Sequence, residues 1–378
     1  MTTAEREQQH PLRAKAKPTV DLLRPRTLKV VDLFAGCGGL SLGAEMAATA
    51  LRRRLDVRLA VDFEAAATQV YRSNFAAARR VLTKPVEEVL SVWTAPELTD
   101  GETRHARRVG RVDVLLGGPP CQGHSNLNNH TRRNDPKNAL YLYMVRAARV
   151  FAPSAVIIEN VPAILHDTFN GSNVVEIARV ELKALGYEVH DQVIPLVDLG
   201  VAQRRKRHVL LATKKPTDSP ATVLEGLIAE PTPVRDLRWA IKDLETASGV
   251  GWDTPPKASP ANSERMQYLV DSGNHDLPNE LRPVCHQGLH SYVSMYGRLK
   301  WDEPAQTITS GFGSIGQGRY MHPGQKRALT AHEAARIQGF PDYFRFGEVQ
   351  KRSDLATMIG NAVPPQLSER IILALHGW

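Results

Sequence analysis

The stretch VVDLFAGCGGLSLG, residues 30–43, joins a short apolar run to three closely spaced glycines. The run has the length of a strand, and the residues that follow it have apolar positions at helical spacing. Gly36, Gly38 and Gly39 therefore fall between a strand and a helix, where backbone amides can approach a ligand closely. A dinucleotide-binding fingerprint would place another glycine where this chain has Ser41. The stretch predicts a ligand-binding turn in an α/β sheet and argues against a nicotinamide cofactor.

Further apolar runs of strand length follow along the chain, separated by segments with helical spacing. These runs cover residues 28–36, 56–63, 112–118, 154–161, 187–196 and 207–213. Strands that alternate with helices indicate a mostly parallel sheet covered on both faces. We therefore expect an α/β fold with a doubly wound, Rossmann-like core over residues 28–213.

The rest of the chain differs in texture. Residues 214–349 are rich in Pro, Gly, Ser and Asp with few long apolar runs, and they predict a second, smaller, loop-rich lobe. Residues 350–378 regain helical spacing and are assigned to the first domain. Residues 1–27 are polar and basic without apolar periodicity, so they predict a flexible arm.

Composition limits the class of protein. The formal net charge of +8 fits a polyanionic partner, although a solvated basic surface would give the same value. No run approaches the roughly 18 to 20 apolar residues that span a bilayer, and the start lacks the apolar core of a signal peptide, so we expect a cytoplasmic protein. The three cysteines have no CxxC spacing, so neither a disulfide framework nor a metal site is expected.

Polar residues follow the ends of several predicted strands, where open sheets carry their active sites. Asp62 could accept hydrogen bonds from ribose hydroxyls, and Phe63 could stack on an adenine ring. Cys121 lies in GGPPCQGHSN, residues 117–126, where glycines and prolines end a strand. Glu159 and Asn160 end the next apolar run. Together these positions favour a catalytic cleft that binds a nucleoside.

Six segments, in chain order, resemble the ordered motifs of the C5-cytosine DNA methyltransferases: DLFAGCGGLSLG, GGPPCQGHSN, IIENV, AQRRKR, RALTAHEAARIQGFP and IGNAVPPQ. The resemblance covers residues 28–213 and 327–378. It implies a class I methyltransferase fold, S-adenosyl-L-methionine as cofactor and double-stranded DNA as partner. The reaction it implies is methyl transfer to C5 of a flipped-out cytosine, with residues 214–349 choosing the DNA sequence.

The same resemblance implies roles for individual residues. Cys121 would add to C6 of cytosine, Glu159 would hold a proton against N3, and Arg205 and Arg207 would orient the base and the cysteine. Four residues would contact DNA: Ser125, Arg132, Arg133 and Gln203. The cofactor would be bound by Asp32, Phe34, Gly36, Gly38, Leu40, Asp62, Phe63, Pro119, Leu140, Asn361, Ala362 and Val363.

Two positions depart from the family pattern near the expected cofactor site. Asp62 stands where the family usually has glutamate, which shortens the reach to ribose by one methylene. Pro85 stands where an aspartate would contact the adenine amine. These departures concern cofactor affinity rather than the type of reaction.

Two other functions remain open at this point. A transfer-RNA cytosine methyltransferase would share the fold and chemistry, but such enzymes usually carry a Cys-Phe-Thr element, and around Cys285 this chain reads PVCHQGLH. A catalytically silent DNA-binding regulator could keep the fold, but Cys121, Glu159 and Arg207 are all present. For the enzyme we expect a monomer, in a restriction-modification system if a cognate endonuclease acts beside it.

Overall fold

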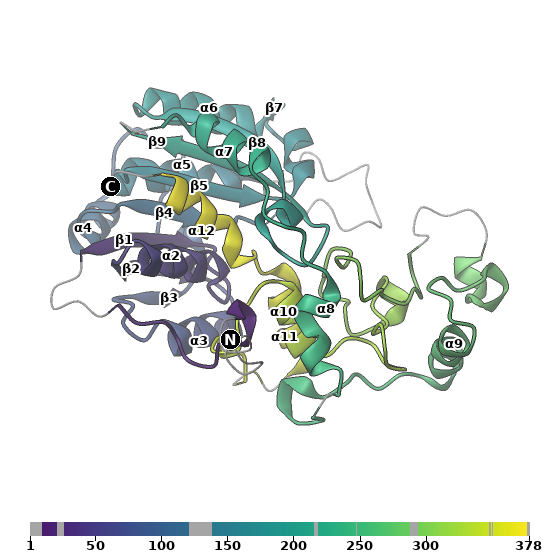
Figure 1. The fold of residues 1–378 in the computed structure, drawn as a ribbon. Coiled ribbons are helices and arrows are strands. Elements are labelled where there is room, and N and C mark those ends of the chain that lie inside the picture. Colours follow the sequence, from purple (N-terminus) through teal and green to yellow (C-terminus); the bar gives the residue numbers. More distant parts are fainter. Residues whose placement is uncertain are drawn as a thin grey trace. The chain divides into compact units, whose positions relative to one another are not determined.

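The computed structural model describes residues 10–20, 26–120, 138–214, 218–246, 248–287, 294–347, 349 and 351–375 (Figure 1). Contacts along the chain divide it into two compact units. The sheet unit comprises Pro18–Leu199, Lys206–Pro231 and Val363–Trp378, and the lobe unit comprises Met1–Lys17, Gly200–Arg205 and Thr232–Ala362. The predicted boundaries at 213/214 and 349/350 thus lie earlier in the sequence than the junctions at 231/232 and 362/363.

Within the described residues, seven strands form one sheet in the order β3-β2-β1-β4-β5-β9-β8. All neighbouring strands are parallel except β9, which runs antiparallel to both β5 and β8. The strands are β1 (Thr27–Leu33), β2 (Arg54–Asp62), β3 (Val81–Thr83), β4 (Val114–Gly117), β5 (Ala155–Asn160), β8 (Glu188–Pro195) and β9 (Lys206–Thr213). The prediction of a mostly parallel α/β sheet is confirmed.

The helices of the sheet unit form two layers (Figure 1). On one face of the sheet, α12 contacts both α2 and α7, and α3 packs against β2 and β3. On the other face, α5 contacts both α4 and α6. The helices are α2 (Gly39–Ala50), α3 (Ala65–Asn74), α4 (Asp100–Val109), α5 (Ala139–Phe151), α6 (Val174–Ala184), α7 (Pro220–Ala229) and α12 (Pro365–Ala374). Shorter elements are η2 (Val86–Glu88), η5 (Pro162–His166), η6 (Leu196–Leu199), β6 (Thr168–Phe169) and β7 (Ser172–Asn173).

Buried apolar strands explain why the sheet lies between two helical layers. Every residue of β4 and β5 is buried, as expected for parallel strands covered on both faces. The register pairs Leu33 of β1 with Val61 of β2 and with Gly117 of β4, and it pairs Gly117 with Ile158 of β5. The carboxyl ends of these four strands therefore meet at one edge of the sheet.

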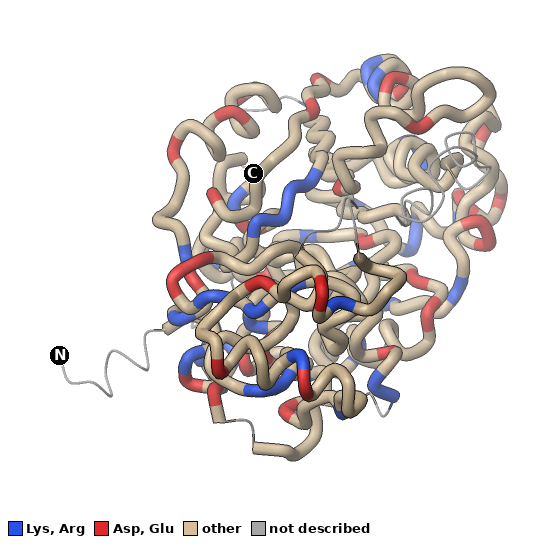
Figure 2. Tube along the Cα trace, turned by 90° about the vertical axis from the view of Figure 1, so that its right-hand side faces the viewer, with Lys and Arg blue, Asp and Glu red and all other residues tan. Residues whose placement is uncertain are grey.

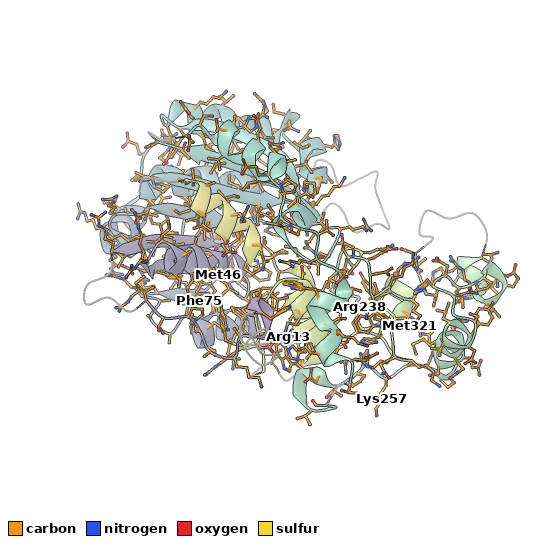
Figure 3. The ribbon with its side chains drawn as sticks, viewed as in Figure 1. Arg13, Met46, Phe75, Arg238, Lys257 and Met321 are labelled. Carbon is orange, nitrogen blue, oxygen red and sulfur yellow. The ribbon has the colours of Figure 1, made fainter. Side chains whose placement is uncertain are left out.

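The lobe unit is built mostly from loops and short helices around a small core. Its core cluster consists of Met266, Leu269, Leu277, Tyr296, Ile315, Met321 and Ala328, of which Met321 is labelled in Figure 3. Its helices are η1 (Pro11–Arg13), α8 (Leu237–Ile241), η7 (Lys242–Leu244), η8 (Gly251–Asp253), α9 (Pro260–Asp271), η9 (Asn279–Leu281), η10 (Val284–His286), η11 (Ile315–Gln317), α10 (Ala331–Ile337) and α11 (Arg352–Asn361). This architecture agrees with the loop-rich texture of the sequence.

Part of the N-terminal segment is packed rather than free. Leu12 is buried in η1, and its carbonyl accepts a hydrogen bond from the Asp342 amide at 2.9 Å. Arg13, labelled in Figure 3, forms an ion pair with Asp243 at 3.3 Å. The expectation of a flexible arm over residues 1–27 is therefore wrong for residues 10–14, because one apolar side chain and backbone hydrogen bonds anchor them.

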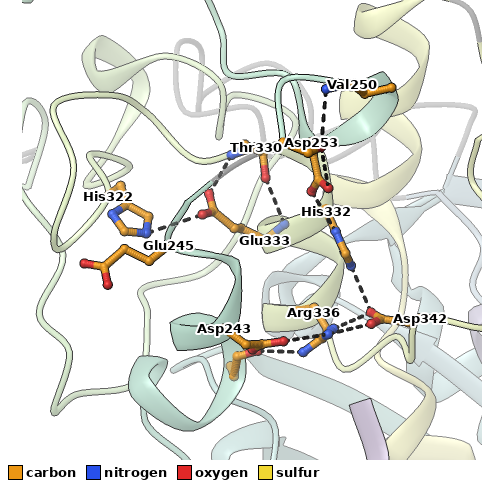
Figure 4. A network of polar contacts seen from close by, with 12 residues as sticks. Asp243, Glu245, Val250, Asp253, His322, Thr330, His332, Glu333, Arg336 and Asp342 are labelled. Carbon is orange, nitrogen blue, oxygen red and sulfur yellow. Dashed lines mark hydrogen bonds and ion pairs between the residues drawn. The ribbon is translucent and has the colours of Figure 1, made fainter. Parts of the chain in front are cut away.

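A network of polar side chains holds the lobe unit together around α10 (Figure 4). The His332 ring bonds to Asp253 at 2.7 Å and to Asp342 at 2.9 Å, and it stacks on Trp252 with ring centroids 4.1 Å apart. Burial acts to lower the pKa of His332, but the two carboxylates outweigh it and raise the pKa above its usual value. Arg336 binds both oxygens of Asp342 at 2.5 and 2.6 Å. These paired charges link α10 to Asp253 of η8 and to Asp342, which follows α10 in the sequence.

No helix among the described residues combines the length and the apolar character required to cross a membrane.

Helix α12 packs directly on α2, and a glycine makes this approach possible. A Cβ on Gly43 would collide with the carbonyl oxygen of Pro365 and the hydroxyl of Ser368. The Ser368 hydroxyl also donates a hydrogen bond of 2.7 Å to the Leu40 carbonyl. The C-terminal helix is therefore fixed to the first helix of the sheet unit by backbone-to-backbone contact.

We expect Gly43→Ala to lower the free energy of unfolding by about 1–3 kcal/mol, because backbone atoms of α12 would have to move. Gly226→Ala in α7 is the matched control, since its Cβ would meet nothing within 4 Å. We expect that control to be neutral or about 0.5–1 kcal/mol more stable, as alanine is the better helix former. Urea unfolding measures both variants, and equal stability of the two would contradict the packing described.

Candidate active site

The glycine-rich turn after β1 has a left-handed backbone conformation at three positions. Phe34, Gly36 and Gly38 have positive φ values of 56°, 54° and 101°. A Cβ on Gly38 would lie 2.5 Å from the ring of Phe75. Gly38 is the residue immediately before α2, so the turn connects β1 to the start of that helix, as the sequence predicted.

Asp62, the last residue of β2, is hydrogen-bonded to this turn. Its carboxylate accepts hydrogen bonds from the amides of Gly36 at 2.8 Å and Glu64 at 2.9 Å. Burial raises the pKa of Asp62, while these amide bonds oppose the shift. A carboxylate offers about four acceptor sites, so Asp62 keeps capacity for hydroxyl donors of a ligand.

Asp32 lies beneath the turn and explains Ser41. Asp32 is fully buried in β1 and accepts a hydrogen bond of 2.6 Å from the Ser41 hydroxyl, which also lies 2.6 Å from the Tyr71 hydroxyl. Burial raises the pKa of Asp32 to about 7, the Ser41 bond opposes this, and the charge of Asp62 adds to it. Serine in place of the fingerprint glycine thus donates a hydrogen bond to one oxygen of a buried acid. The structure places Asp32 as a support of the turn, outside the lining of the cavity described next.

A cavity of about 420 Å³ opens beside this turn within the sheet unit. Its size falls in the range of small-molecule sites. It is lined by Phe34, Asp62, Phe63, Lys84, Pro85, Val86, Glu87, Pro120, Ala139, Leu140 and Tyr143. Aromatic and aliphatic side chains can cover the faces of a purine, and Asp62 can accept hydrogen bonds from ribose hydroxyls. The residues present therefore fit the nucleoside part of S-adenosylmethionine.

Only some of the predicted cofactor residues line this cavity. Phe34, Asp62, Phe63 and Leu140 do so, and Phe63 is 56% exposed, which leaves its ring free to stack. The turn residues Gly36 and Gly38, together with Leu40 and Pro119, lie outside the lining. Asn361 and Ala362 belong to the lobe unit, and Val363 is the first residue of the sheet unit after them.

Lys84, Glu87 and Tyr143 also line the cavity, and sequence reasoning did not name them. Lys84 and Glu87 flank Pro85 just beyond β3, at the same edge of the sheet as Asp62. That position after a strand was the indication in the sequence that could have identified them. Tyr143 lies within α5, where its apolar neighbours gave no such indication.

Glu159 and Arg207 form a buried ion pair at the carboxyl end of β5. Glu159 pairs with Val209 of the antiparallel strand β9, so Arg207, two residues before Val209, presents its side chain on the same face. Arg207 Nε lies 2.5 Å from Glu159 Oε1, with the two side chains 10% and 8% exposed. Burial lowers the pKa of Arg207, and the charge of Glu159 opposes that shift. The structure thus joins two predicted catalytic residues that lie far apart in the sequence.

The loop that leads to the predicted nucleophile is held against this pair. The Asn160 side-chain amide donates a hydrogen bond of 3.0 Å to the Pro119 carbonyl. A Cβ built on Gly118 would lie 3.1 Å from Glu159 Oε2, so the loop backbone runs close beside the carboxylate. Cys121 follows Pro120 directly in the sequence.

Four predicted site residues lie outside the described residues: Cys121, Ser125, Arg132 and Arg133.

Gln203 is placed in the interior of the lobe unit rather than at a DNA contact. It is fully buried, its side-chain nitrogen donates to Gln338 Oε1 at 2.7 Å, and its oxygen accepts from the Ile308 amide at 3.0 Å. Both ends of the Gln203 amide are thus engaged inside the protein, at a residue for which the resemblance implies a DNA contact. Arg205 is likewise buried, and it donates to the carbonyls of Ile308 at 2.8 Å and Gly360 at 3.3 Å. These contacts give Arg205 a role in fixing the backbone of its own unit.

Charged residues are spread along the chain. Figure 2 shows Lys and Arg interspersed with Asp and Glu over the trace. The net charge of +8 therefore arises from a small excess distributed through the sequence.

Comparison with known proteins identifies the family. A family model described as C-5 cytosine-specific DNA methylase matches residues 28–376. The chain is 43% identical over 367 residues to the type II methyltransferase M1.BsuMI of Bacillus subtilis, covering 97% of this chain and 83% of that protein. It is 32% identical to the type II methylase M.HgiDII of Herpetosiphon aurantiacus, covering 90% and 93% of the two chains.

A solved structure has the same fold. The crystal structure of the S. pombe Dnmt2 methyltransferase aligns with a TM-score of 0.61 and 17% identity, covering 93% of this chain and 98% of that chain. The chain belongs to the C-5 cytosine-specific DNA methylase family.

Proposed function

We propose that this protein methylates C5 of a cytosine that is flipped out of a specific sequence of double-stranded DNA, through a covalent bond between Cys121 and C6 of the base. The observation that carries the proposal is the buried Glu159–Arg207 pair beside Gly118 and Pro119. A carboxylate and a guanidinium at this place can serve the N3 and O2 edge of one pyrimidine. The loop held against them leads directly to the cysteine.

The chemistry requires this set of groups. Cytosine C5 is too electron-poor to attack a methyl donor, so a thiolate must first bond to C6 and push electron density toward N3 and O2. Glu159 holds a proton at N3 and Arg207 hydrogen-bonds O2, which stabilises the charge that develops there. S-adenosylmethionine, bound in the cavity, would supply an electrophilic methyl group. C5 would take this methyl group, the C5 proton would pass to water, and expulsion of the Cys121 thiolate from C6 would then restore the aromatic ring.

The target base has to leave the duplex before any of these groups can reach it. Extrusion costs a few kcal/mol, which contacts to phosphates and to the flanking bases must offset. The segment after Cys121 contains Ser125, Arg132 and Arg133, and we assign these residues to that task because they follow the nucleophile directly. Residues 214–326, within the predicted lobe 214–349, would read the sequence, since the catalytic motifs do not use them.

The relatives favour DNA over transfer RNA as the substrate, because M1.BsuMI and M.HgiDII are both named as type II enzymes. We therefore propose a monomeric type II modification enzyme, which would work beside a separate restriction endonuclease of the same specificity. A silent regulator is disfavoured because Glu159 and Arg207 retain a paired catalytic geometry.

Duplex DNA in which 5-fluorocytosine replaces cytosine is expected to trap the enzyme covalently, since fluorine cannot leave C5 as a proton. The measurement is a denaturation-stable adduct that forms only with S-adenosylmethionine. Cys121→Ser should abolish it, whereas Cys285→Ser, at an exposed free cysteine, should not. Burial raises the pKa of Cys37 to about 12, which makes that thiol a poor nucleophile. Peptide mapping of the bond to Cys37 or Cys285 would refute the mechanism.

Glu159→Gln is expected to slow methyl transfer by about 10²- to 10⁴-fold, because it removes the proton held at N3. DNA affinity should change little, since phosphate contacts are untouched. Single-turnover transfer to unmethylated genomic DNA and fluorescence anisotropy measure the two effects. Glu225→Gln, at an exposed position in α7, is the control and should behave as wild type. Equal losses of rate and affinity would instead give Glu159 a structural role.

Exchange of residues 214–326 for the matching segment of a relative with another target should transfer the target sequence. Base-edge contacts discriminate at about 1–3 kcal/mol each, whereas phosphate contacts carry no sequence information. Genome-wide mapping of 5-methylcytosine in cells lacking other cytosine methylation reads the outcome. An active chimera that keeps the original target would show that sequence choice lies elsewhere in the chain.

A further inference from the structure

The cavity beside the glycine turn contains polar side chains that the proposed mechanism does not use. Lys84, Glu87 and Tyr143 line it together with Asp62. Lys84 is already paired, because its Nζ lies 3.2 Å from the carboxylate of Glu88. The polar groups left to recognise a ligand in this part of the lining are thus Glu87 and Tyr143.

Glu87 and Tyr143 lie close enough to influence each other. Burial raises the pKa of the Tyr143 hydroxyl, and the negative charge of Glu87 raises it further. Glu87 is in the middle of η2 and Tyr143 is in α5, so two separate elements bring a carboxylate and a phenol to one cavity. The carboxylate can only accept hydrogen bonds, whereas the hydroxyl can donate one.

The neighbouring side chains in the cavity lining have no polar atom that could form a hydrogen bond with the edge of a base. Pro85 has no backbone N–H and no polar side-chain atom, and Val86 and Leu140 are apolar. These residues can pack on the faces of a purine without distinguishing one purine from another. Among the side chains in this part of the lining, Glu87 and Tyr143 are therefore the ones that can recognise the polar edge of a purine.

The purine of the proposed cofactor has an edge that suits this pair. Adenine presents an amino group, which donates hydrogen bonds, beside a ring nitrogen that accepts them. Hypoxanthine, its deaminated form, presents a carbonyl oxygen and an N–H in the same places. A carboxylate that faces the amino position accepts a hydrogen bond from adenine, whereas hypoxanthine presents at that position a carbonyl oxygen that the carboxylate repels.

We propose that Glu87 determines the specificity of this cavity for adenine, by accepting a hydrogen bond from the adenine amino group in the place where Pro85 offers no acceptor. The inference rests on the proposed function, because it takes the cavity to be the S-adenosylmethionine site. A hydrogen bond to a charged group changes affinity by about 10- to 100-fold.

Calorimetric titration of the full chain with S-adenosylhomocysteine and with its inosine analogue tests the proposal without catalysis. The wild-type protein should prefer the adenine compound by about 10- to 100-fold. Glu87→Gln should reduce this preference to within about threefold, because the amide offers a donor as well as an acceptor. Glu225→Gln is the matched control: it makes the same change of charge at an exposed position in α7, and Glu225 lies outside the cavity lining.

Each outcome decides a different point. If Glu87→Gln keeps the wild-type preference, or if Glu225→Gln loses it equally, the role of Glu87 is refuted. If the wild-type protein binds both compounds equally well, the cavity does not read the purine edge and the inference also fails. If the wild-type protein binds neither compound, the cofactor assignment itself fails, and with it the proposed function. Unfolding midpoints of the variants, expected to match wild type because Glu87 is exposed, verify that all are folded.

Discussion

The alignment of strand ends in the parallel sheet is the constraint on which the site depends. Because β2, β1, β4 and β5 run in the same direction and in register, the residues that follow them share one edge. The glycine turn, Asp62, the Gly118–Pro119 loop and Glu159 are all products of that alignment. The single antiparallel strand next to β5 adds Arg207, which enters the edge from the opposite chain direction. Geometry of the backbone, rather than proximity in sequence, assembles the chemistry.

Buried polar groups near this edge are each given a specific partner. Ser41 donates to one oxygen of Asp32, backbone amides donate to Asp62, and Arg207 pairs with Glu159. An unpaired buried carboxylate would be costly, so these bonds are needed for the turn and the loop to keep their shapes. Buried polar side chains also have partners in the lobe unit, where Gln203 and Arg205 form hydrogen bonds with carbonyls and an amide of the protein interior. Gln203 and Arg205, for which the resemblance implies contacts with DNA or the target base, are thus buried in the protein interior.

The fold could be predicted from the sequence in large part, because its information is local. Apolar runs of strand length, interrupted by helical spacing, indicated the α/β sheet, and the glycines at 36 and 38 indicated the turn whose positive φ values the structure shows. The candidate positions Phe34, Asp62, Phe63 and Leu140 line one cavity. Each of these positions lies in or just after a segment whose pattern can be read within a few residues.

The sequence by itself determined the class of fold, the family and the chemical types available at the strand ends, since these depend on short patterns and ordered motifs. Only the tertiary structure decided which polar residues face a cavity and which are buried. Ser41 departs from the dinucleotide fingerprint, yet it donates a hydrogen bond to Asp32. Gln203 lies in a family motif, yet its side chain is buried. Glu87 and Tyr143 line one cavity although they lie in distant segments of the sequence. The physical reason is that hydrogen-bond partners and solvent access are set by residues remote in sequence, through the packing of strands and helices, and no local pattern encodes them.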